Sequence, residues 1–291
     1  QALACSQAVR SGMVQLILLD RSEADLANPE KCGEIINQTI ADVVVNAAAL
    51  TAVTDAEAQV NTAIAINGTA PGIMAAAAAA RGLPFIQIST DYVFDGEGIR
   101  PWLTGDSTNP NTVYGSSKRL GEVGVMSAYE NIDTPFAVLR TSWVISARGK
   151  NFASTILNAG QRNGHVSVVS DQIGGPTPAD DLATAIVHIA ESLVAKTASG
   201  GIYHYSGAPD VSWYDLAREI FEVAGLSVEV KDILTSDLSD RTARPLNSRL
   251  DCTTTERVFG LPRPDWRAAL PTIVADLQRR TKSHATLTGA V

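Results

Sequence analysis

The sequence lacks the residue patterns of a metal site and of a disulfide-bonded scaffold. Its 291 residues contain three cysteines and four histidines, and none of them stands in the spacing of a zinc site. An odd number of scattered cysteines is typical of a protein from a reducing compartment. We therefore expect a cytoplasmic protein without a bound metal ion.

The sequence also lacks an excess of basic residues and a long apolar run. Its formal net charge of −8 argues against electrostatic binding to nucleic acid, which needs a basic face. No apolar run reaches the length that spans a bilayer, and the small-residue tract 75–80 is expected inside a helix. With 45% hydrophobic residues, the chain can bury the core of one large α/β domain or of two lobes. We expect neither nucleic acid nor membrane as a partner.

Short apolar runs alternate with longer helical patterns, which is typical of a parallel sheet covered by helices on both faces. The expected strands are residues 14–20, 42–46, 83–89, 136–140 and 166–169, and the clearest helical stretches are 61–80, 118–129, 181–195 and 212–223. This order predicts a Rossmann-like, doubly wound α/β fold with a smaller C-terminal substrate-binding lobe. We assign residues 1–143 to a dinucleotide-binding domain and 144–291 mainly to the second lobe, with about 179–206 returning to the first domain.

The beginning of the chain departs from a complete dinucleotide-binding unit. Such a unit carries a glycine-rich turn after its first strand and an acidic residue about 20 residues further on. Asp20 fits the acidic position, but residues 1–10 already resemble the helix that follows the turn. We expect the natural protein to extend N-terminally by roughly a dozen residues, one strand and a turn. Asp20 either bonds an adenosine ribose or caps the next turn, and Arg21 beside it would suit a 2′-phosphate, so NADH and NADPH both remain open.

The sharpest chemical pattern is Tyr114-Gly-Ser-Ser-Lys118. Residues four apart share one face of a helix, so a phenol and an ammonium group can enter one site. The ammonium would lower the phenol pKa and make the tyrosine a proton donor to a carbonyl oxygen. Taken alone, the pattern also fits an exposed structural pair. A hydroxyl from Ser89 or Thr90, at the carboxyl end of the strand 83–89, could bond the same oxygen, because ligands of open α/β sheets bind at that edge.

Six blocks in order resemble the extended short-chain dehydrogenase/reductases and, within them, the dTDP-4-dehydrorhamnose reductases. The blocks are 44–49 (VVNAAA), 89–94 (STDYVF), 114–118 (YGSSK), 140–144 (RTSWV), 171–177 (DQIGGPT) and 244–250 (RPLNSRL). The resemblance implies reduction of the C4 ketone of dTDP-4-dehydro-6-deoxy-L-mannose to dTDP-L-rhamnose by NADPH or NADH, the last step of dTDP-rhamnose biosynthesis.

The same resemblance implies roles for individual residues. Tyr114 would donate the proton, Lys118 would orient the nicotinamide ribose and lower the tyrosine pKa, and Thr90 would complete the triad at the sugar oxygen. The implied substrate contacts are Thr90, Asp91, Trp143, Asn247 and Arg249. The implied cofactor contacts are Asp20, Asp25, Leu26, Ala49, Leu50, Thr51, Tyr114 and Lys118.

The chain departs from the family at two positions. Leu50 stands where a polar aromatic residue or histidine is frequent, which puts one cofactor contact in doubt. Cys5 stands where some members carry a glutamate of a magnesium site at the dimer interface. We therefore expect no magnesium site here, while a homodimer remains open.

Two alternatives share the fold. A nucleotide-sugar epimerase usually has Tyr-Gly-Pro, following an asparagine, after the sixth strand, where this chain has residues 140–145 (RTSWVI). The second alternative is a non-catalytic regulatory subunit similar to the β subunit of methionine adenosyltransferase. An intact pair of Tyr114 and Lys118 is compatible with such a subunit, which would catalyse no reaction. The block around Trp143 favours the reductase over both.

Overall fold

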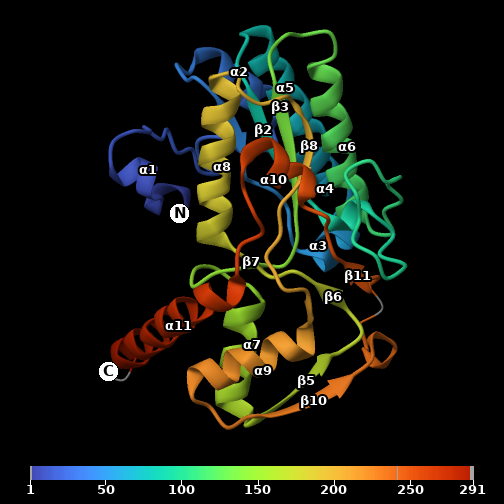
Figure 1. Ribbon diagram of the computed structural model, residues 1–291, viewed down its shortest axis with the longest axis vertical. Helices are drawn as coiled ribbons and strands as arrows, with labels where there is room; N and C mark the ends of the chain where they lie inside the picture. The colour runs from blue at the N-terminus through green and yellow to red at the C-terminus, as the bar shows by residue number, and fades with distance from the viewer. Residues whose placement is uncertain (1, 241, 289–291) are drawn as a thin grey trace.

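The structure is a computed structural model that describes residues 2–240 and 242–288, without the side chains of residues 5, 7, 8 and 281–288. Figure 1 shows two bodies, a larger one built on a parallel sheet and a smaller one below it that carries the C-terminal helix. The carboxyl ends of the sheet strands point toward the smaller body. Ligands of open α/β sheets bind at that edge, so the junction between the bodies is the expected site.

The sheet of the larger body has four parallel strands in the order β1-β2-β3-β8. They are β1 (Val44–Asn46), β2 (Phe85–Thr90), β3 (Phe136–Thr141) and β8 (Gly201–His204). The predicted strands 42–46, 83–89 and 136–140 are thereby confirmed, and the parallel pairing of β8 with β3 brings the segment around residue 200 back to the sheet. The α/β fold class is confirmed.

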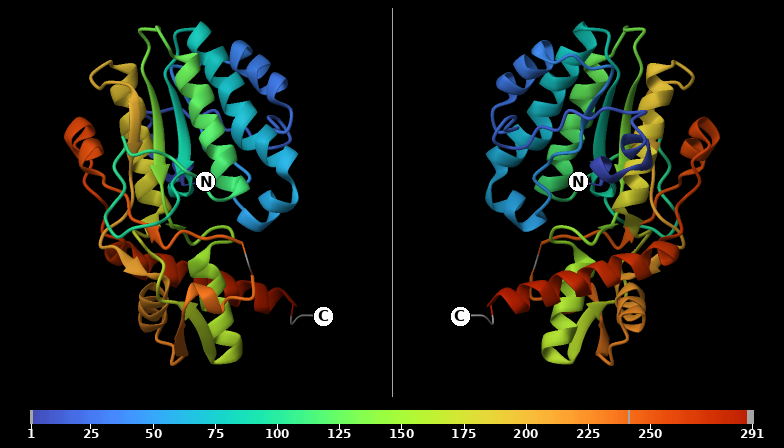
Figure 2. Two further views of the ribbon diagram at one scale, coloured as in Figure 1. Left: turned by 90° about the vertical axis from the view of Figure 1, so that its right-hand side faces the viewer. Right: turned by 90° about the vertical axis from the view of Figure 1, so that its left-hand side faces the viewer.

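Helices cover both faces of this sheet (Figure 2). On one face lie α2 (Pro29–Gln38), α5 (Ala70–Ala80) and α6 (Val113–Ala128), and on the other α8 (Ala179–Val194) and α10 (Thr253–Phe259). Neighbouring strand residues point to opposite faces, so Phe85 packs on the first helix layer while Ile86 packs on α8. This two-sided burial explains the near-continuous apolar strands.

The predicted helix 61–80 is confirmed as one continuous run. It consists of α4 (Val60–Ala63), the π-helical turn η2 (Ile64–Thr69) and α5. By length and hydropathy the run Val60–Ala80 could cross a membrane, which corrects the expectation from sequence. Half of its most apolar window is buried inside the protein, where α5 packs between α2 and α6. It is a core helix of this fold.

The predicted strand 14–20 is wrong. The segment has no regular structure, and Met13, Ile17, Leu18 and Leu19 are exposed. A strand needs a neighbour that satisfies its backbone hydrogen bonds. Among the described residues no strand pairs with this segment, because β1 forms that edge of the sheet with β2 as its neighbour.

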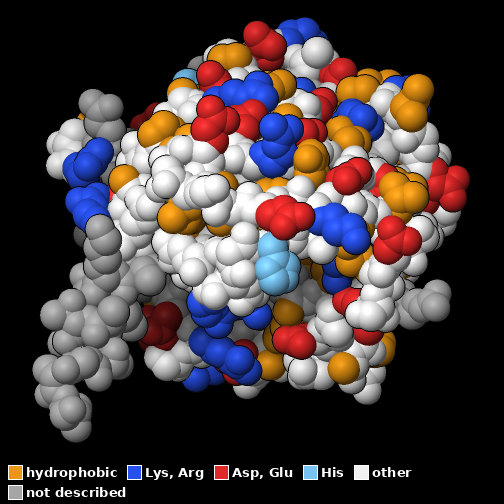
Figure 3. Space-filling view, turned by 90° about the horizontal axis from the view of Figure 1, so that it is seen from below, with side chains coloured by type: hydrophobic (Ala, Val, Ile, Leu, Met, Phe, Trp, Pro, Cys, Tyr) orange, Lys and Arg blue, Asp and Glu red, His pale blue; other side chains and the backbone are white. Residues whose placement is uncertain are grey.

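The smaller body packs helices on a two-stranded parallel sheet. Its elements are α7 (Phe152–Asn163), β5 (His165–Val169), α9 (Trp213–Ala224), β10 (Glu229–Ile233) and α11 (Trp266–Thr288). Its core surrounds the fully buried Trp266 and includes Leu157 and Ile220. Figure 3, seen from below, shows acidic and basic side chains interspersed on this face of the molecule.

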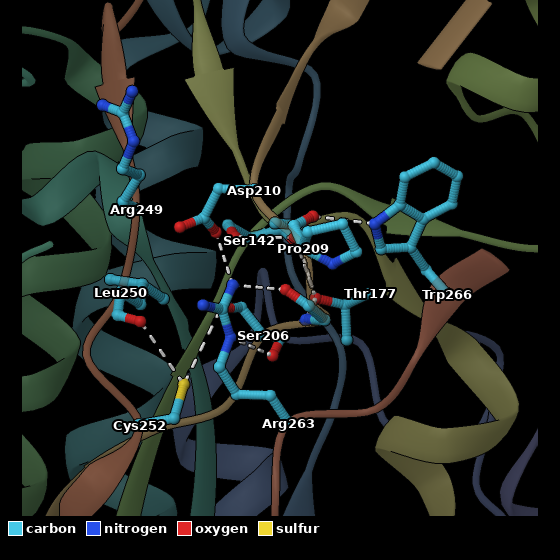
Figure 4. Close-up of polar contacts among 12 residues, drawn as sticks. Ser142, Thr177, Ser206, Pro209, Asp210, Arg249, Leu250, Cys252, Arg263 and Trp266 are labelled. Carbon is cyan, nitrogen blue, oxygen red and sulfur yellow. Dashed lines mark hydrogen bonds and ion pairs between the residues drawn. The ribbon is translucent and has the colours of Figure 1, made fainter. Parts of the chain in front are cut away.

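Polar contacts join residues of several chain segments (Figure 4). Arg263 binds the main-chain oxygen of Ser206 at 3.2 Å and also contacts Gly207 and Asp210. Thr177 donates to the main-chain oxygen of Ser142 at 2.7 Å. These bonds join Arg263 to residues 206–210 and Thr177 to Ser142. The shorter elements are η1 (Leu3–Cys5), α1 (Gln7–Arg10), α3 (Val53–Ala58), η3 (Asp91–Val93), β4 (Val144–Ile145), β6 (Ile173–Gly174), β7 (Thr177–Pro178), β9 (Val211–Ser212), η4 (Thr235–Asp237) and β11 (Asn247–Ser248).

Candidate active site

Helix α6 carries the tyrosine and lysine of the predicted pair near its N-terminus. Thr112 caps the helix by accepting a hydrogen bond from the Gly115 N–H at 3.0 Å. Tyr114 and Lys118 lie four residues apart and are both buried, with 9% and 4% of their surface exposed. This burial excludes the alternative of an exposed structural pair. Gly115 is required, because a Cβ there would lie 2.1 Å from the main-chain oxygen of Tyr92.

Thr90 and Asp91 lie at the carboxyl end of β2, directly beside Tyr114. The Thr90 hydroxyl lies close enough to the Tyr114 phenol to lower its pKa, and it accepts from the Tyr92 N–H at 3.2 Å. It lies 3.0 Å from an oxygen of the Asp91 carboxylate. The structure therefore brings together the threonine and tyrosine that the sequence analysis placed at one substrate oxygen.

The pKa values of Tyr114 and Lys118 differ in part from the expectation that the lysine lowers the pKa of the tyrosine. Burial raises the pKa of Tyr114 to about 12, although the Thr90 hydrogen bond opposes this shift. Burial lowers the pKa of Lys118 to about 8, and the Glu122 carboxylate opposes that shift. The lysine Nζ donates to the main-chain oxygen of Ile88 at 2.5 Å. Without a ligand, the tyrosine is thus a neutral phenol at pH 7, ready to give a proton.

Ser89 is not available to a substrate oxygen, which narrows the earlier choice between Ser89 and Thr90. Its hydroxyl donates to the Glu122 carboxylate at 2.6 Å. Glu122 is fully buried and also accepts two hydrogen bonds from the Arg140 guanidinium, at 2.8 and 2.7 Å. Behind Arg140 stands His204, whose pKa burial lowers to about 4. The sequence analysis missed this buried ion pair, which lies one helical turn after Lys118.

Asp91 is the most unusual carboxylate in the site. It is 3% exposed, and its Oδ2 atom has no hydrogen-bond partner within the described part of the chain. Burial raises its pKa to about 6, against hydrogen bonds from Ser248 and Thr90. An unpaired buried acceptor lowers stability, so a ligand that donates a hydrogen bond to it would be stabilised there. A sugar hydroxyl would be such a donor.

The predicted cofactor contacts among residues 20–26 include both exposed and buried side chains. Asp20 is exposed and accepts from the N–H and hydroxyl of Ser22, at 2.7 and 2.6 Å, so it does cap the following turn. Asp25 accepts from the N–H of Ala27 and pairs with Arg21 at 3.3 Å. The side chain of Leu26 is buried in the core, which leaves only its backbone for a cofactor.

The residues after β1 line the approach to the tyrosine. Leu50 packs in the same apolar cluster as Tyr114, while Thr51 is exposed and Ala49 half-buried. Asn67, in the π-helical turn η2, fixes this segment: it accepts from the Leu50 N–H at 2.8 Å and donates to the Leu50 oxygen at 3.0 Å. The sequence analysis missed Asn67, and only the helical irregularity, visible in the structure, marks it.

The predicted nucleotide-end residues have different surroundings. Asn247 is buried, and its side chain makes hydrogen bonds within the protein. It donates to the Arg100 oxygen at 2.8 Å and accepts from Arg249 Nη1 at 3.0 Å. It holds Arg249 in place. Arg249 itself is half-buried, directly follows β11, and lies apart from Arg263 and its contacts (Figure 4). Trp143 is half-buried at the junction of the two bodies.

The fold is that of the extended short-chain dehydrogenases/reductases, and it brings Thr90, Tyr114 and Lys118 together at the carboxyl end of the sheet. The sequence matches the family described as RmlD substrate binding domain over residues 2–279, and the chain belongs to this family.

Relatives of known name agree with this assignment. A dTDP-4-dehydrorhamnose reductase of Sinorhizobium fredii is 38% identical over 267 residues, which cover 90% of this chain and 89% of that protein. The crystal structure of a dTDP-4-dehydrorhamnose reductase from Clostridium acetobutylicum superposes with a TM-score of 0.84 at 33% identity, covering 94% and 97% of the two chains. One from Bacillus anthracis, in complex with NADP, has a TM-score of 0.82 at 27% identity, covering 94% and 96%.

Proposed function

We propose that this protein reduces the C4 ketone of dTDP-4-dehydro-6-deoxy-L-mannose to dTDP-L-rhamnose with NADPH or NADH. The observation that carries the proposal is the buried contact between Thr90 and Tyr114 on α6, one turn before Lys118, in a chain of the RmlD family. The similarity to named reductases over nine-tenths of the chain supplies the substrate class.

The proton of the new hydroxyl comes from Tyr114. Its raised pKa keeps the phenol protonated at pH 7, so it can protonate the C4 oxygen while that oxygen gains negative charge. Thr90, which lies beside the phenol, donates a hydrogen bond to the C4 oxygen and fixes its position. The Lys118 ammonium, held by the Ile88 oxygen, stabilises the phenolate that the proton leaves behind.

The residues at the carboxyl end of β1 fit a nicotinamide dinucleotide. Ala47 and Ala48 are exposed and small there, so a flat ring and ribose can approach the backbone next to Leu50 and Lys118. Asp20 is exposed, so its carboxylate would be accessible to an adenosine ribose. When bound, a reduced nicotinamide supplies the hydride, and the protein supplies orientation and charge.

The junction between the two bodies fits the sugar nucleotide. Asp91 offers its unpaired oxygen to a sugar hydroxyl, and the indole of Trp143 covers one face of the hexose. Arg249, held by Asn247, suits a diphosphate, because its planar guanidinium can donate two parallel hydrogen bonds.

Compartment and assembly belong to the same proposal. Cys32 and Cys252 are buried free thiols, which fits the cytoplasm. The apolar side chains Val60, Ile64 and Leu120 are exposed on neighbouring helices and offer a surface for a second copy in a homodimer. Light scattering coupled to gel filtration gives the oligomeric state directly, and a monomer at micromolar concentration would contradict the homodimer.

The proposed reaction is tested by consumption of reduced cofactor in the presence of dTDP-4-dehydrorhamnose. The expected result is loss of the reduced-cofactor absorbance matched by formation of dTDP-L-rhamnose. Conversion of a nucleotide sugar without net cofactor consumption would indicate an epimerase. Cofactor binding without any turnover, together with copurification of a synthetase, would support the regulatory-subunit alternative.

A further inference from the structure

Trp143 has a backbone conformation that its side chain disfavours. Its φ is +49°, in the left-handed region, where bulky residues are uncommon. The described chain has two other non-glycine residues with positive φ, Asn131 and Lys196. A tryptophan in this conformation persists only where its surroundings impose it, and such residues cluster at functional sites.

Two neighbours determine where the Trp143 indole lies. On one side the indole of Trp213 stacks on it, with ring centroids 3.5 Å apart and planes inclined by 10°. At its edge Gly174 leaves room, because a Cβ there would lie 2.8 Å from Trp143 Cε2. The Trp143 oxygen also accepts the Thr177 N–H at 3.0 Å, which fixes the backbone.

Trp213 belongs to the smaller body and is itself firmly placed. It is the first residue of α9, which Ser212 caps by accepting the Asp215 N–H at 3.0 Å. The ring of Phe152 packs against it at 4.3 Å. Trp143, in contrast, belongs to the larger body: it lies two residues after the end of the sheet strand β3. The stacked indoles therefore link the smaller body to the sheet.

The stack lies next to the substrate side of the site. Gly174 separates the Trp143 indole from Ser248, and the Ser248 side chain lies near the Asp91 carboxyl group, whose pKa it lowers. One face of the Trp143 ring is occupied by Trp213, so a sugar can meet only its other face or its edge. The ring plane that a sugar encounters is thus set by a residue that the sugar does not touch.

We propose that Trp213 is a positioning residue for sugar binding, which holds the Trp143 indole in the orientation that covers the hexose. This inference rests on the proposed function. It predicts that sugar affinity depends on an aromatic ring at position 213, while cofactor affinity and the proton transfer at Tyr114 do not.

The stack itself is measured without any ligand. Two stacked indoles couple their transitions, so wild-type protein should show an exciton couplet in its circular dichroism. The couplet should disappear in both Trp213→Leu and Trp213→Phe, and persist in the control Tyr214→Leu, which removes the adjacent aromatic ring. Absence of the couplet from the wild type overturns the inference.

The kinetic arm separates positioning from mere packing. Trp213→Leu should raise the KM for the sugar nucleotide by roughly 3–10-fold, the size of a lost aromatic stack. Its kcat and its affinity for NADPH should change by less than about twofold, and Trp213→Phe should restore the KM. An unchanged sugar KM in a folded Trp213→Leu protein, or an equal loss of cofactor affinity, overturns the inference.

Failure of the proposed reaction is distinguishable from failure of this inference. Wild-type protein that shows the couplet but does not reduce dTDP-4-dehydrorhamnose contradicts the proposed function. Calorimetric titration with dTDP-L-rhamnose then decides the inference. Weaker binding to Trp213→Leu than to wild type supports it, and equal or absent binding to both overturns it.

Discussion

The ammonium group of Lys118 donates a hydrogen bond to the main-chain oxygen of Ile88, 2.5 Å away. This bond ties the helix that carries Tyr114 to the strand that ends in Thr90. The proton donor, the hydroxyl beside it and the stabilising cation thus come from two elements locked together, so their geometry exists before a ligand binds. Preorganised groups of this kind lower the reorganisation that the transition state requires.

Substitution of Tyr114 by Phe removes the proton donor and keeps the ring that packs against Tyr92. We expect kcat to fall by about 10²–10⁴-fold, the usual contribution of a general acid. The dissociation constant for NADPH, measured by fluorescence titration, should stay within about twofold, because only the hydroxyl is lost. Wild-type kcat in this variant would show that another group supplies the proton.

The pH dependence of reduction should reflect the buried lysine. Burial lowers the Lys118 pKa to about 8, so the side chain is an ammonium below that pH and a neutral amine above it. Since only the ammonium stabilises the phenolate, kcat/KM should decline as the pH rises through about 8. A flat kcat/KM profile up to pH 10 would contradict this role.

Glu122 provides a second test of the same titration. Its carboxylate raises the Lys118 pKa, so Glu122→Gln should move the alkaline decline of kcat/KM to lower pH. Because the variant leaves the buried Arg140 guanidinium without its ionic partner, the free energy of unfolding should also fall by about 3–5 kcal/mol. The exposed Glu130→Gln is the matched control and should change neither quantity. A destabilised Glu122→Gln protein with an unshifted profile would reduce Glu122 to a structural role.

The ionised Asp91 carboxylate should lower the free energy of unfolding at neutral pH. Its folded pKa of about 6 lies above the ordinary carboxyl value of 3.8, so the folded state binds the proton more tightly than the unfolded chain. The ionised form therefore costs stability, and the cost grows from pH 4 to pH 6 and is complete above it. Asp91→Asn should be more stable than wild type by about 1–3 kcal/mol at pH 7, with a gain that shrinks toward pH 4.

The same variant should bind the sugar nucleotide less tightly, since it loses the unpaired acceptor. Urea denaturation at pH 4, 5.5 and 7 measures the first effect, and the sugar KM measures the second. Equal stability of the two proteins at pH 7 would show that the carboxylate is not held at a cost.

Gly115 should tolerate no side chain. A Cβ at this position would lie 2.1 Å from the Tyr92 main-chain oxygen, so Gly115→Ala must displace the start of α6 and with it Tyr114. We expect kcat/KM to fall at least tenfold, because small displacements of reacting groups strongly reduce the rate. Gly105→Ala is the control, since nothing lies within 4 Å of a Cβ there. Equal activities of the two variants would contradict the close packing of α6 on η3.

Local pattern predicted most of the sheet and the catalytic helix. The strands around Phe85 and Phe136 and the helix with Tyr114 and Lys118 combine apolar periodicity with nearby turn residues, and these signals are carried by the segments themselves. Residues 14–20 carry the same apolar signal and yet form no strand, because strand formation depends on a partner elsewhere in the chain. A hydrophobic pattern indicates which residues tend to be buried. Whether a segment pairs with another strand depends on the whole sheet.

Within the site, the sequence predicted the residues that a motif contains and missed those that support them. Ser89 reads as a free hydroxyl until the fold brings Glu122 to 2.6 Å from it. Asn67 and Trp213 act through contacts with residues 17 and 70 positions away, so no local spacing reveals them. Asn247 was expected at the substrate, and the structure adds its bonds to the Arg100 oxygen and to Arg249, the first of which joins segments far apart in the sequence.

In the proposed reaction the protein delivers a hydride from the cofactor to C4 of the sugar, while Tyr114 supplies the proton to the C4 oxygen. The most direct measurement uses NADPH deuterated at the transferred position of the nicotinamide, with dTDP-4-dehydrorhamnose as substrate and mass spectrometry of the product. We predict dTDP-L-rhamnose carrying one deuterium at C4 from the wild-type protein and very little product from Tyr114→Phe. Product without deuterium, or no product from a wild-type sample that binds NADPH, would contradict the claim.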